Sequence, residues 1–264
     1  MNVGDIINFL NEIAPWRYAE EWDSVGLMVG SRESYVTKIL LCMDVTSDVI
    51  SEAAQCGAQM ILSHHPFIFS KLKSIDMETF KGEQIANLIK NNISVVSAHT
   101  NLDTAPGGVN DTLAESLHLT NSRNLKPYMP KGLECDLGMG KVGELQNSKS
   151  FDEFVIDVKK SLCIENLRII GVKPKKVKKV AVFCGSFDDD LESLKSLKVD
   201  VLVTGDIKYH IALDAAQMGL CIVDAGHFAT ERIILPKLRD TLNKRFKELD
   251  IICSKMETDP FTFA

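Results

Sequence analysis

The sequence predicts an α/β fold made of two linked lobes, because short apolar segments alternate along the chain with helical segments. Its 264 residues, 45% of them hydrophobic, are enough to bury a sizeable core. In open α/β sheets, functional groups collect beyond the carboxyl ends of the strands, and histidines follow several of the apolar segments here. The expected site therefore lies between the two lobes, at the carboxyl ends of strands.

The N-terminal half begins with an amphipathic helix that carries Ile6, Phe9, Leu10 and Ile13 on one face. A strand over 36–41 and a helix over 46–56 follow, and Gly57 is placed to end that helix. The remaining expected elements of this half are a strand at 59–62, a helix at 82–90 and a strand at 93–98.

The C-terminal half repeats this order of signals at an offset of 141 residues. Residues 177–183 match 36–42, the helix start at Asp188–Asp190 matches Ser47 and Asp48, and 201–206 match the segment that ends in the His64-His65 pair. A helix over 210–218 and a strand over 220–225 come next. We interpret the two halves as a duplication, with chance similarity of two ordinary α/β units as the alternative.

A segment rich in proline and glycine, 127–140, is the expected boundary between lobes 1–126 and 127–264. The helix after it begins with a capping box, Ser150 to Glu153. The same region contains Gly138, Gly140 and Gly143 in a formal G-x-G-x-x-G pattern. Because a strand runs through this pattern and no helix opens after it, we interpret it as a false match to a dinucleotide site.

Three clusters predict a metal site. They are the adjacent pair His64 and His65, the His99 to Asp103 segment, and the His227 to Glu231 segment. Neighbouring side chains on extended backbone point to opposite sides, so the histidine pair suggests ligands for two metal ions. A histidine satisfied by hydrogen bonds at a strand end is the alternative for each cluster alone, but three similar clusters favour metal binding.

The mixed nitrogen and oxygen donors leave Zn, Fe, Mn and Ni open, and the clusters contain no thiol of the kind that structural zinc sites use. Two divalent ions bridged by a carboxylate typically activate water, so hydrolysis is the expected chemistry. Glu231 is expected to open a helix that runs to Leu242, and Asp103 to lie in a loop. Asp44 and Asp206 follow apolar strands and are candidates to orient imidazoles, with turn or cap roles as the alternative.

Other features indicate ordinary structural roles. His118, placed within the helix of residues 111–117, and His210 are expected to be structural, and the lysines of 173–179 to form a solvated lead-in to a strand. No P-loop or G-x-S-x-G pattern is present. The net charge of −6 disfavours broad nucleic-acid binding. Seven cysteines without a C-x-x-C pair and no apolar run of about 20 residues predict a cytoplasmic protein without a membrane span.

Several motifs together resemble the YbgI-like dinuclear-metal proteins, many of which carry the name GTP cyclohydrolase 1 type 2 homologue. The resemblance covers essentially the whole chain and rests on Ala14-Pro15, residues 22–27 with Gly30, Ser63 to Pro66, Ser97 to Asp103, Gly107 to Asp111, Gly140 to Glu144, Thr204 to Asp206, and Asp224 to His227 with Glu231. Ser24 stands where the family commonly has Asn. The short connection over 127–150 indicates that the inserted domain of larger members is absent.

The resemblance implies five metal ligands, His64, His65, Asp103, His227 and Glu231, for two divalent ions per chain. His99 then becomes a candidate to orient a metal ligand or to transfer a proton. The resemblance further implies a homohexamer and a small-molecule substrate, with a nucleotide as one candidate. The expected function is a dinuclear metal-dependent hydrolase, nominally a cyclohydrolase. The alternatives are a non-catalytic metal-binding scaffold, metallochaperone or regulator, and a nucleic-acid-associated ring that uses the lysine patch.

Overall fold

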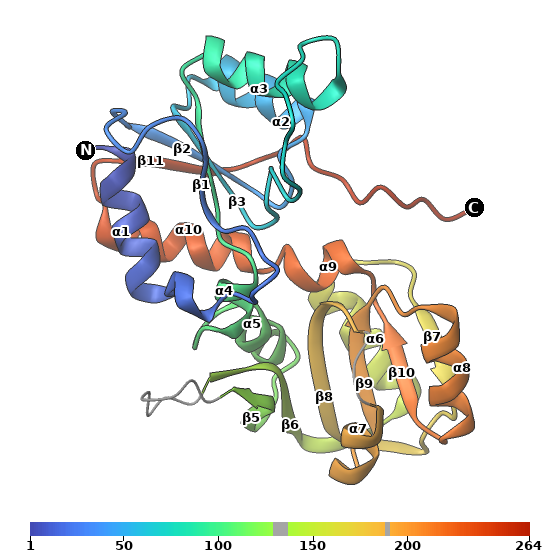
Figure 1. Ribbon diagram of the computed structural model, residues 1–264. Helices are drawn as coiled ribbons and strands as arrows, with labels where there is room; N and C mark the ends of the chain where they lie inside the picture. Colours follow the sequence, from blue (N-terminus) through green and yellow to red (C-terminus); the bar gives the residue numbers. More distant parts are fainter. Residues whose placement is uncertain (129–136, 188–190) are drawn as a thin grey trace. The chain divides into compact units, whose positions relative to one another are not determined.

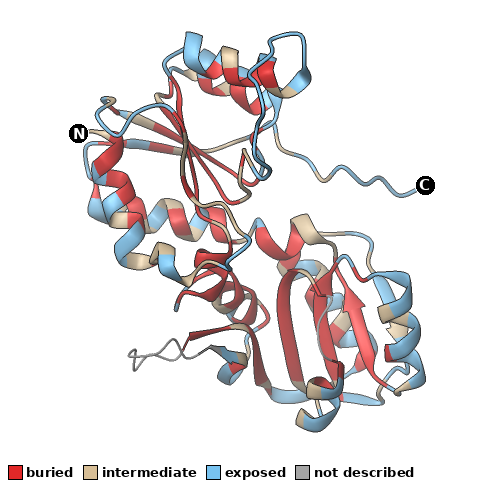
Figure 2. Ribbon diagram, in the orientation of Figure 1, coloured by how far each residue is buried: buried red, intermediate tan, exposed pale blue. Residues whose placement is uncertain are grey.

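The computed structural model describes residues 1–128, 137–187 and 191–264, which form two compact units. Unit 1 comprises residues 1–105 and 234–258, and unit 2 comprises residues 106–233 and 259–264. Each unit contains one β-sheet with helices packed on it, and the strands of both sheets are mostly buried (Figures 1 and 2). The predicted α/β class is confirmed.

Unit 1 contains a five-stranded sheet in the order β1-β4-β3-β2-β11. Strands β2, β3, β4 and β11 are parallel, and β1 runs antiparallel to β4 at one edge. The strands are β1 (Gly26–Val29), β2 (Lys38–Cys42), β3 (Met60–Ser63), β4 (Ser94–Ser97) and β11 (Asp250–Cys253). The helices are α1 (Val3–Ile13), η1 (Trp16–Tyr18), α2 (Ser47–Cys56), α3 (Phe80–Lys90), α4 (Thr100–Thr104) and α10 (Ile234–Arg245).

Apolar side chains of α2 and α3 pack with those of β2, β3 and β4 to form one core of unit 1. Helix α2 lies where the sequence predicts, to within one residue at its start. Thr46 caps α2 by accepting a hydrogen bond from the Val49 N–H, and Gly57 ends it at a φ of 69°. Figure 1 places α1 and α10 on the face of this sheet away from α2 and α3.

Unit 2 contains a six-stranded sheet in the order β5-β6-β8-β9-β10-β7. Its central strands β8, β9 and β10 are parallel. The strands are β5 (Thr120–Tyr128), β6 (Leu137–Ser150), β7 (Arg168–Gly171), β8 (Lys176–Ser186), β9 (Val201–Gly205) and β10 (Cys221–Asp224). The helices are α5 (Val109–Ser116), α6 (Phe151–Leu162), α7 (Leu191–Leu197), α8 (Tyr209–Gln217) and α9 (His227–Glu231).

The units divide elsewhere than at the expected boundary of 126/127. Strand β5 pairs antiparallel with β6, so its hydrogen bonds place residues 120–128 in the second sheet. Strand β11 pairs with β2, so the segment that contains it belongs to the first unit. Local composition marked a connection rich in proline and glycine, but pairing between strands that are distant in sequence decides the division.

The two sheets share a four-stranded arrangement that confirms the predicted repeat in strand order and direction. In unit 1 the order is β1-β4-β3-β2 and in unit 2 it is β7-β10-β9-β8, with the first strand antiparallel in both. Ile39 pairs with Met60, and Val180 pairs with Val201, so the offset of 141 residues preserves the pairing register. The expected helix start at Asp188–Asp190 lies outside the described residues.

Two smaller predictions have clear outcomes. The G-x-G-x-x-G pattern lies within β6, which confirms that it does not open a helix. The prediction that His118 lies within a helix was wrong. His118 follows α5, and its φ of 55° ends the helical backbone. No helix in the described parts of the chain has both the length and the apolar character needed to cross a bilayer.

Candidate metal centre

The histidine pair directly follows strand β3. The backbone N–H groups of His64 and His65 donate to the carbonyl groups of Cys42 and Met43, at 3.0 and 2.9 Å, and this continues the pairing with β2 beyond the strand end. His64 is almost fully buried and His65 is partly exposed, as expected for neighbours that point to different sides. Their ring centroids are 5.1 Å apart.

Four imidazoles share one hydrogen-bonding pattern. The Nδ1 atom of each lies 2.9 Å from an acceptor: the Ala98 carbonyl for His64, Asp44 for His65, Asp23 for His99 and Asp206 for His227. Carbonyl and carboxylate oxygens only accept hydrogen bonds, so Nδ1 carries the proton in each ring. In the neutral rings, Nε2 then presents its electron pair, and a metal-binding histidine needs this arrangement.

Carboxylates face two of these Nε2 atoms. Asp103 Oδ1 lies 3.5 Å from His64 Nε2 in unit 1, and Glu231 Oε2 lies 3.1 Å from His227 Nε2 in unit 2. The side chains of Asp103 and Glu231 are only 5% and 4% exposed, so water screens these contacts little. A buried carboxylate oxygen that faces an imidazole electron pair is stabilised by a cation between them. These donors therefore fit a divalent metal ion.

The three histidines of unit 1 also lie together. One ring nitrogen from each of His64, His65 and His99 lies within 4.8 Å of the others. The ring centroid of His99 is 5.3 Å from that of His64 and 5.5 Å from that of His65. This grouping agrees with the sequence argument, in which His99 belongs to the cluster.

The carboxylates lie on two matching short helices, α4 and α9, each of which follows the third parallel strand of its unit. Two expectations were wrong here. Asp103 lies in α4 and not in a loop, and Glu231 ends α9, after which α10 begins at Ile234. A helix of five residues is too short to show periodicity in sequence. The predicted spacing of one turn between His227 and Glu231 is confirmed.

Asp44 and Asp206 orient imidazoles, as one of their two interpretations predicted. Asp44 follows β2 and bonds His65, while Asp206 follows β9 and bonds His227. Both carboxylates are partly exposed, with 53% and 45% of the side chain accessible. A charged acceptor on Nδ1 fixes the ring and raises the basicity of Nε2.

Sequence reasoning missed the role of Asp23. Its Oδ1 accepts hydrogen bonds from His99 Nδ1 and from the Ser24 N–H, and its Oδ2 accepts from the Thr100 N–H and hydroxyl. Burial acts to raise the pKa of Asp23, but the bonds from His99 and Thr100 outweigh it and lower the pKa to about 2. Asp23 is therefore a fixed anion behind His99. The only signal in sequence was its place in the Trp22 to Leu27 motif.

Glu257 was also missed, because it is distant in sequence from the groups it binds. Its Oε1 accepts hydrogen bonds from the backbone N–H groups of Met43 and Asp44, at 2.5 and 2.8 Å. Burial raises the pKa of Glu257 to about 7, although these two hydrogen bonds act in the opposite direction. Glu257 thus fixes the backbone that carries Asp44.

The Glu231 carboxylate packs directly against the backbone of Gly185. A Cβ atom at this position would lie 2.2 Å from Glu231 Oε1 and 3.2 Å from His227 Nε2. The φ of Gly185 is +63°, which side chains other than glycine rarely adopt. Its N–H donates to the Thr230 hydroxyl at 3.1 Å. Glycine here makes room for the Glu231 carboxylate.

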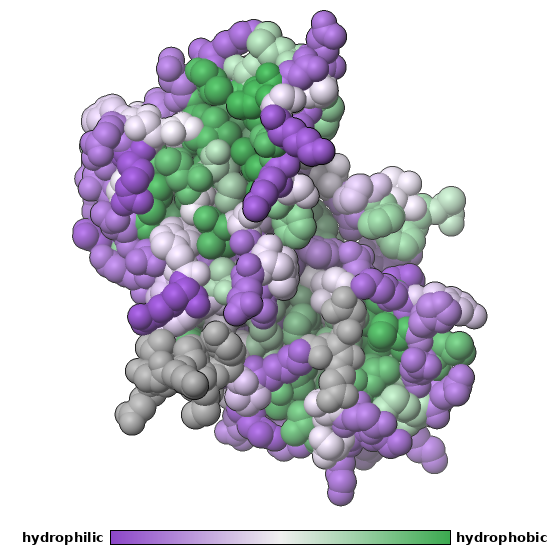
Figure 3. Space-filling view, viewed as in Figure 1, coloured by the Kyte–Doolittle hydropathy of each residue, from purple (hydrophilic) through white to green (hydrophobic). Residues whose placement is uncertain are grey.

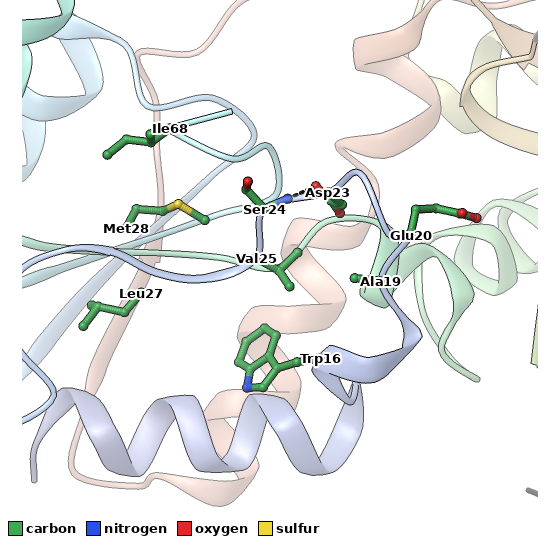
Figure 4. A pocket seen from close by; sticks show the side chains of 9 residues that line it. All are labelled: Trp16, Ala19, Glu20, Asp23, Ser24, Val25, Leu27, Met28 and Ile68. Atoms are coloured by element: carbon green, nitrogen blue, oxygen red, sulfur yellow. Dashed lines mark hydrogen bonds between the residues drawn. The ribbon is translucent and has the colours of Figure 1, made fainter. Parts of the chain in front are cut away.

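An open pocket of about 530 Å³ adjoins Asp23 in unit 1. Figure 4 shows Asp23 and Ser24 at its rim, joined by their hydrogen bond, with Val25, Leu27, Met28 and Ile68 along one side and Trp16 on another. Six of the lining residues are apolar and three, Glu20, Asp23 and Ser24, are polar, and more of the exposed lining surface is polar than apolar. A pocket of this size accommodates a small molecule.

The lysine segment leads into a strand, because β8 begins at Lys176. Lys178 Nζ donates to the carbonyl groups of Leu145 and Gln146, and Lys179 Nζ donates to that of Leu197. The ring of His210 is exposed and contacts the Tyr209 ring edge-on, with centroids 5.4 Å apart. The lysine segment agrees with the strand lead-in that the sequence predicts, and the structural role of His210 stays a prediction.

Comparison with known proteins agrees with the resemblance. A curated relative from Clostridium perfringens, named GTP cyclohydrolase 1 type 2 homolog, is 42% identical over 264 residues and covers all of both chains. The crystal structure of a Bacillus cereus protein related to NIF3 matches with a TM-score of 0.91 and 29% identity, over 100% of this chain and 99% of that one. The structure of protein ybgI shares the fold, with a TM-score of 0.85, 24% identity and coverage of 98% and 99%. The model of the Duf34/NIF3 (NGG1p interacting factor 3) family matches residues 1–260, and the chain belongs to this family.

Proposed function

We propose that the protein is a dinuclear metal-dependent hydrolase whose metal ligands are His64, His65, Asp103, His227 and Glu231. The observation that carries the proposal is the shared imidazole pattern, in which Nδ1 donates a hydrogen bond, so the neutral ring has its electron pair on Nε2, the atom that would bind a cation. Two buried carboxylates that face such nitrogens supply the negative charge that divalent ions need.

The number of ligands supports a shared site. Unit 1 supplies His64, His65 and Asp103, and unit 2 supplies His227 and Glu231. A divalent transition-metal ion commonly takes four or more ligands, so neither set alone satisfies two ions. We therefore propose that the two sets bind the same pair of ions, with a carboxylate as the bridge. Zn, Fe, Mn and Ni all accept this mixture of nitrogen and oxygen donors.

The chain's own groups have distinct roles in this proposal. Asp44 and Asp206 hold the protons on Nδ1 of His65 and His227, which places the electron pair of each neutral ring on Nε2. Asp23 holds the Nδ1 proton of His99, so His99 Nε2 is the atom that accepts a proton and returns it. Bound ions would supply water activation and polarisation of the scissile bond.

The nominal substrate is GTP, on the basis of the names that the curated relatives carry. The alternative is a non-catalytic metal-binding scaffold, metallochaperone or regulator. Turnover of GTP or of a phosphoester that appears on metal loading and disappears with a chelator would favour the hydrolase. Stoichiometric metal binding without turnover of either compound would favour the alternative. The homohexamer and the cytoplasmic location stay predictions, and light scattering of the purified protein tests the first.

A double-mutant cycle on metal affinity tests the shared site. Metal-free wild type, His64→Ala, His227→Ala and the double variant are titrated with Zn²⁺ against a chromophoric chelator. If both residues bind one pair of ions, the losses in binding free energy are not additive. Additive losses, with one full-affinity ion left in each single variant, would mean two separate sites and would overturn the proposal.

A further inference from the structure

Two large aromatic side chains are exposed beside the histidines of unit 1. Trp22 is 60% exposed and Phe69 is 56% exposed, and their ring centroids are 6.0 Å apart at an interplanar angle of 54°. Figure 3 shows hydrophobic side chains among the hydrophilic ones in the part of the surface that Figure 1 assigns to the first sheet. Exposed aromatic area is unfavourable in water, so a close pair of such rings calls for a functional explanation.

The pair is continuous with the candidate metal centre. The Trp22 ring lies edge-on to the His99 ring, with centroids 6.1 Å apart, and His99 in turn lies 5.3 Å from His64 and 5.5 Å from His65. His99 therefore neighbours both Trp22 and the histidine pair. A ring that rests on Trp22 would lie close to His99.

The backbone that carries Trp22 is held in place by the next residue in the sequence, and Phe69 lies in a connection that is long only in unit 1. Asp23 follows Trp22 directly and is fixed by hydrogen bonds with His99, Ser24 and Thr100. Phe69 lies in the long connection between β3 and α3, residues 64–79, whereas the matching connection between β9 and α8 in unit 2 spans only 206–208. The repeat of the fold therefore does not account for Phe69, which belongs to a segment that unit 1 alone carries.

The geometry selects the way a ligand would bind. A flat ring placed between two parallel walls needs about 7 Å between them, since contacting layers lie about 3.5 Å apart. The 6.0 Å separation and 54° tilt do not provide this. A ring would instead stack on the open face of Trp22 with Phe69 along its side, and the bicyclic indole offers the area for a bicyclic partner.

We propose that Trp22 and Phe69 form a stacking platform for a planar bicyclic heteroaromatic ring of purine size, which presents its substituents to His99 and the metal ligands. The inference rests on the proposed hydrolase function for its biological meaning, but the stacking itself requires no metal. It names the substrate class of that function as a molecule with such a ring.

The test is binding of guanosine, a purine probe without phosphate, to metal-free and metal-loaded protein, followed by quenching of tryptophan fluorescence and by calorimetry. Trp22→Leu and Phe69→Leu should each weaken binding at least about fivefold, because stacking of a base on an aromatic side chain contributes this much or more. Trp22→Phe should restore most of the affinity. Ribose should not bind. Tyr209→Leu, which removes an exposed aromatic ring in unit 2, should leave guanosine affinity unchanged.

The outcomes separate the two proposals. Guanosine binding that depends on Trp22 in metal-free protein supports the platform, even if the metal pair or the hydrolase activity fails its own test. Absence of guanosine binding by wild type, or equal affinity in Trp22→Leu and wild type, overturns the platform. A change of oligomeric state in Trp22→Leu without loss of guanosine affinity also overturns it and assigns the two rings to contacts between chains.

Discussion

His64 Nε2 lies 3.5 Å from Asp103 Oδ1, and both groups are almost fully buried. Because His64 Nδ1 donates to the Ala98 carbonyl, the neutral ring directs an electron pair at a carboxylate. This contact is unfavourable in the absence of a cation or a proton. It suits a metal-bound protein better than a metal-free one, so the two states should respond differently to mutation.

Asp103→Asn should lower metal affinity at least about tenfold, since it removes a charged ligand from a buried site. In the metal-free protein, the same change should alter the free energy of unfolding by less than about 1 kcal/mol, because the amide N–H can donate to His64 Nε2. Chelator competition gives the affinity, and urea unfolding of metal-free protein gives the stability.

Asp111→Asn is the matched control for Asp103→Asn. Asp111 forms an ion pair of 2.8 Å with Lys141 and is not among the proposed ligands. Its substitution should leave the metal affinity unchanged. Equal metal affinity of Asp103→Asn and wild type would remove Asp103 from the ligand set.

Glu231→Gln should reduce metal content below two ions per chain while the fold stays intact, because the amide keeps the shape but removes a charge that offsets two cations. Elemental analysis of purified protein gives the content, and circular dichroism checks the fold. A structural zinc site would behave differently, since metal loss would unfold the chain. His118→Gln, at an exposed position after α5, should change neither quantity. One ion per chain in both wild type and Glu231→Gln would contradict a bridged pair.

Glu257 should make the metal-free protein less stable as pH rises from about 4.5 to about 7. Its pKa is 4.5 in the reference state and about 7 when folded, so in this window the folded chain retains a proton that the unfolded chain releases. The expected loss is about 2 kcal/mol after allowance for partial exposure. Glu257→Gln, whose carbonyl still accepts the Met43 and Asp44 N–H groups, should remove this loss in urea unfolding measured across the window.

Glu153→Gln is the control for the pH dependence. Hydrogen bonds from the Ser150 side chain and backbone lower the pKa of Glu153 from its ordinary value of 4.5, so from about one pH unit above that value this group is ionised in both states. Its substitution should leave the slope in the upper part of the window, from about pH 5.5 to 7, unchanged. The same slope in Glu257→Gln and wild type would show that another group binds the proton.

The sequence predicted the parts of the fold that depend on local pattern. Apolar runs located β2, β3, β9 and β10, and the capping box at Ser150 located the start of α6, because strands and caps leave signals within a few residues. The unit division could not be found in this way. The pairing of β11 with β2 joins segments far apart in sequence, and no local signal records which strands become neighbours.

The residues of the candidate site also differ in whether a local sequence signal marks them. The ligand candidates were found because each histidine directly follows an apolar run. Asp23 and Glu257 were missed because they act through hydrogen bonds to His99 and to the backbone of Met43 and Asp44, which lie far from them in sequence. The helical setting of Asp103 and Glu231 was misread because α4 and α9 are single turns, too short for a periodic signal.

Gly185→Ala should reduce metal occupancy although it replaces none of the proposed ligands. The new Cβ would lie 2.2 Å from Glu231 Oε1, so the carboxylate must move, and the φ of +63° adds backbone strain of about 1–2 kcal/mol. Gly57→Ala is matched to it, because Gly57 has a φ of +69° and a Cβ there meets nothing within 4 Å. Both variants should lose stability in urea unfolding, but only Gly185→Ala should lose metal in elemental analysis. Equal metal content in the two variants would mean that the position of the Glu231 carboxylate does not matter to the ions.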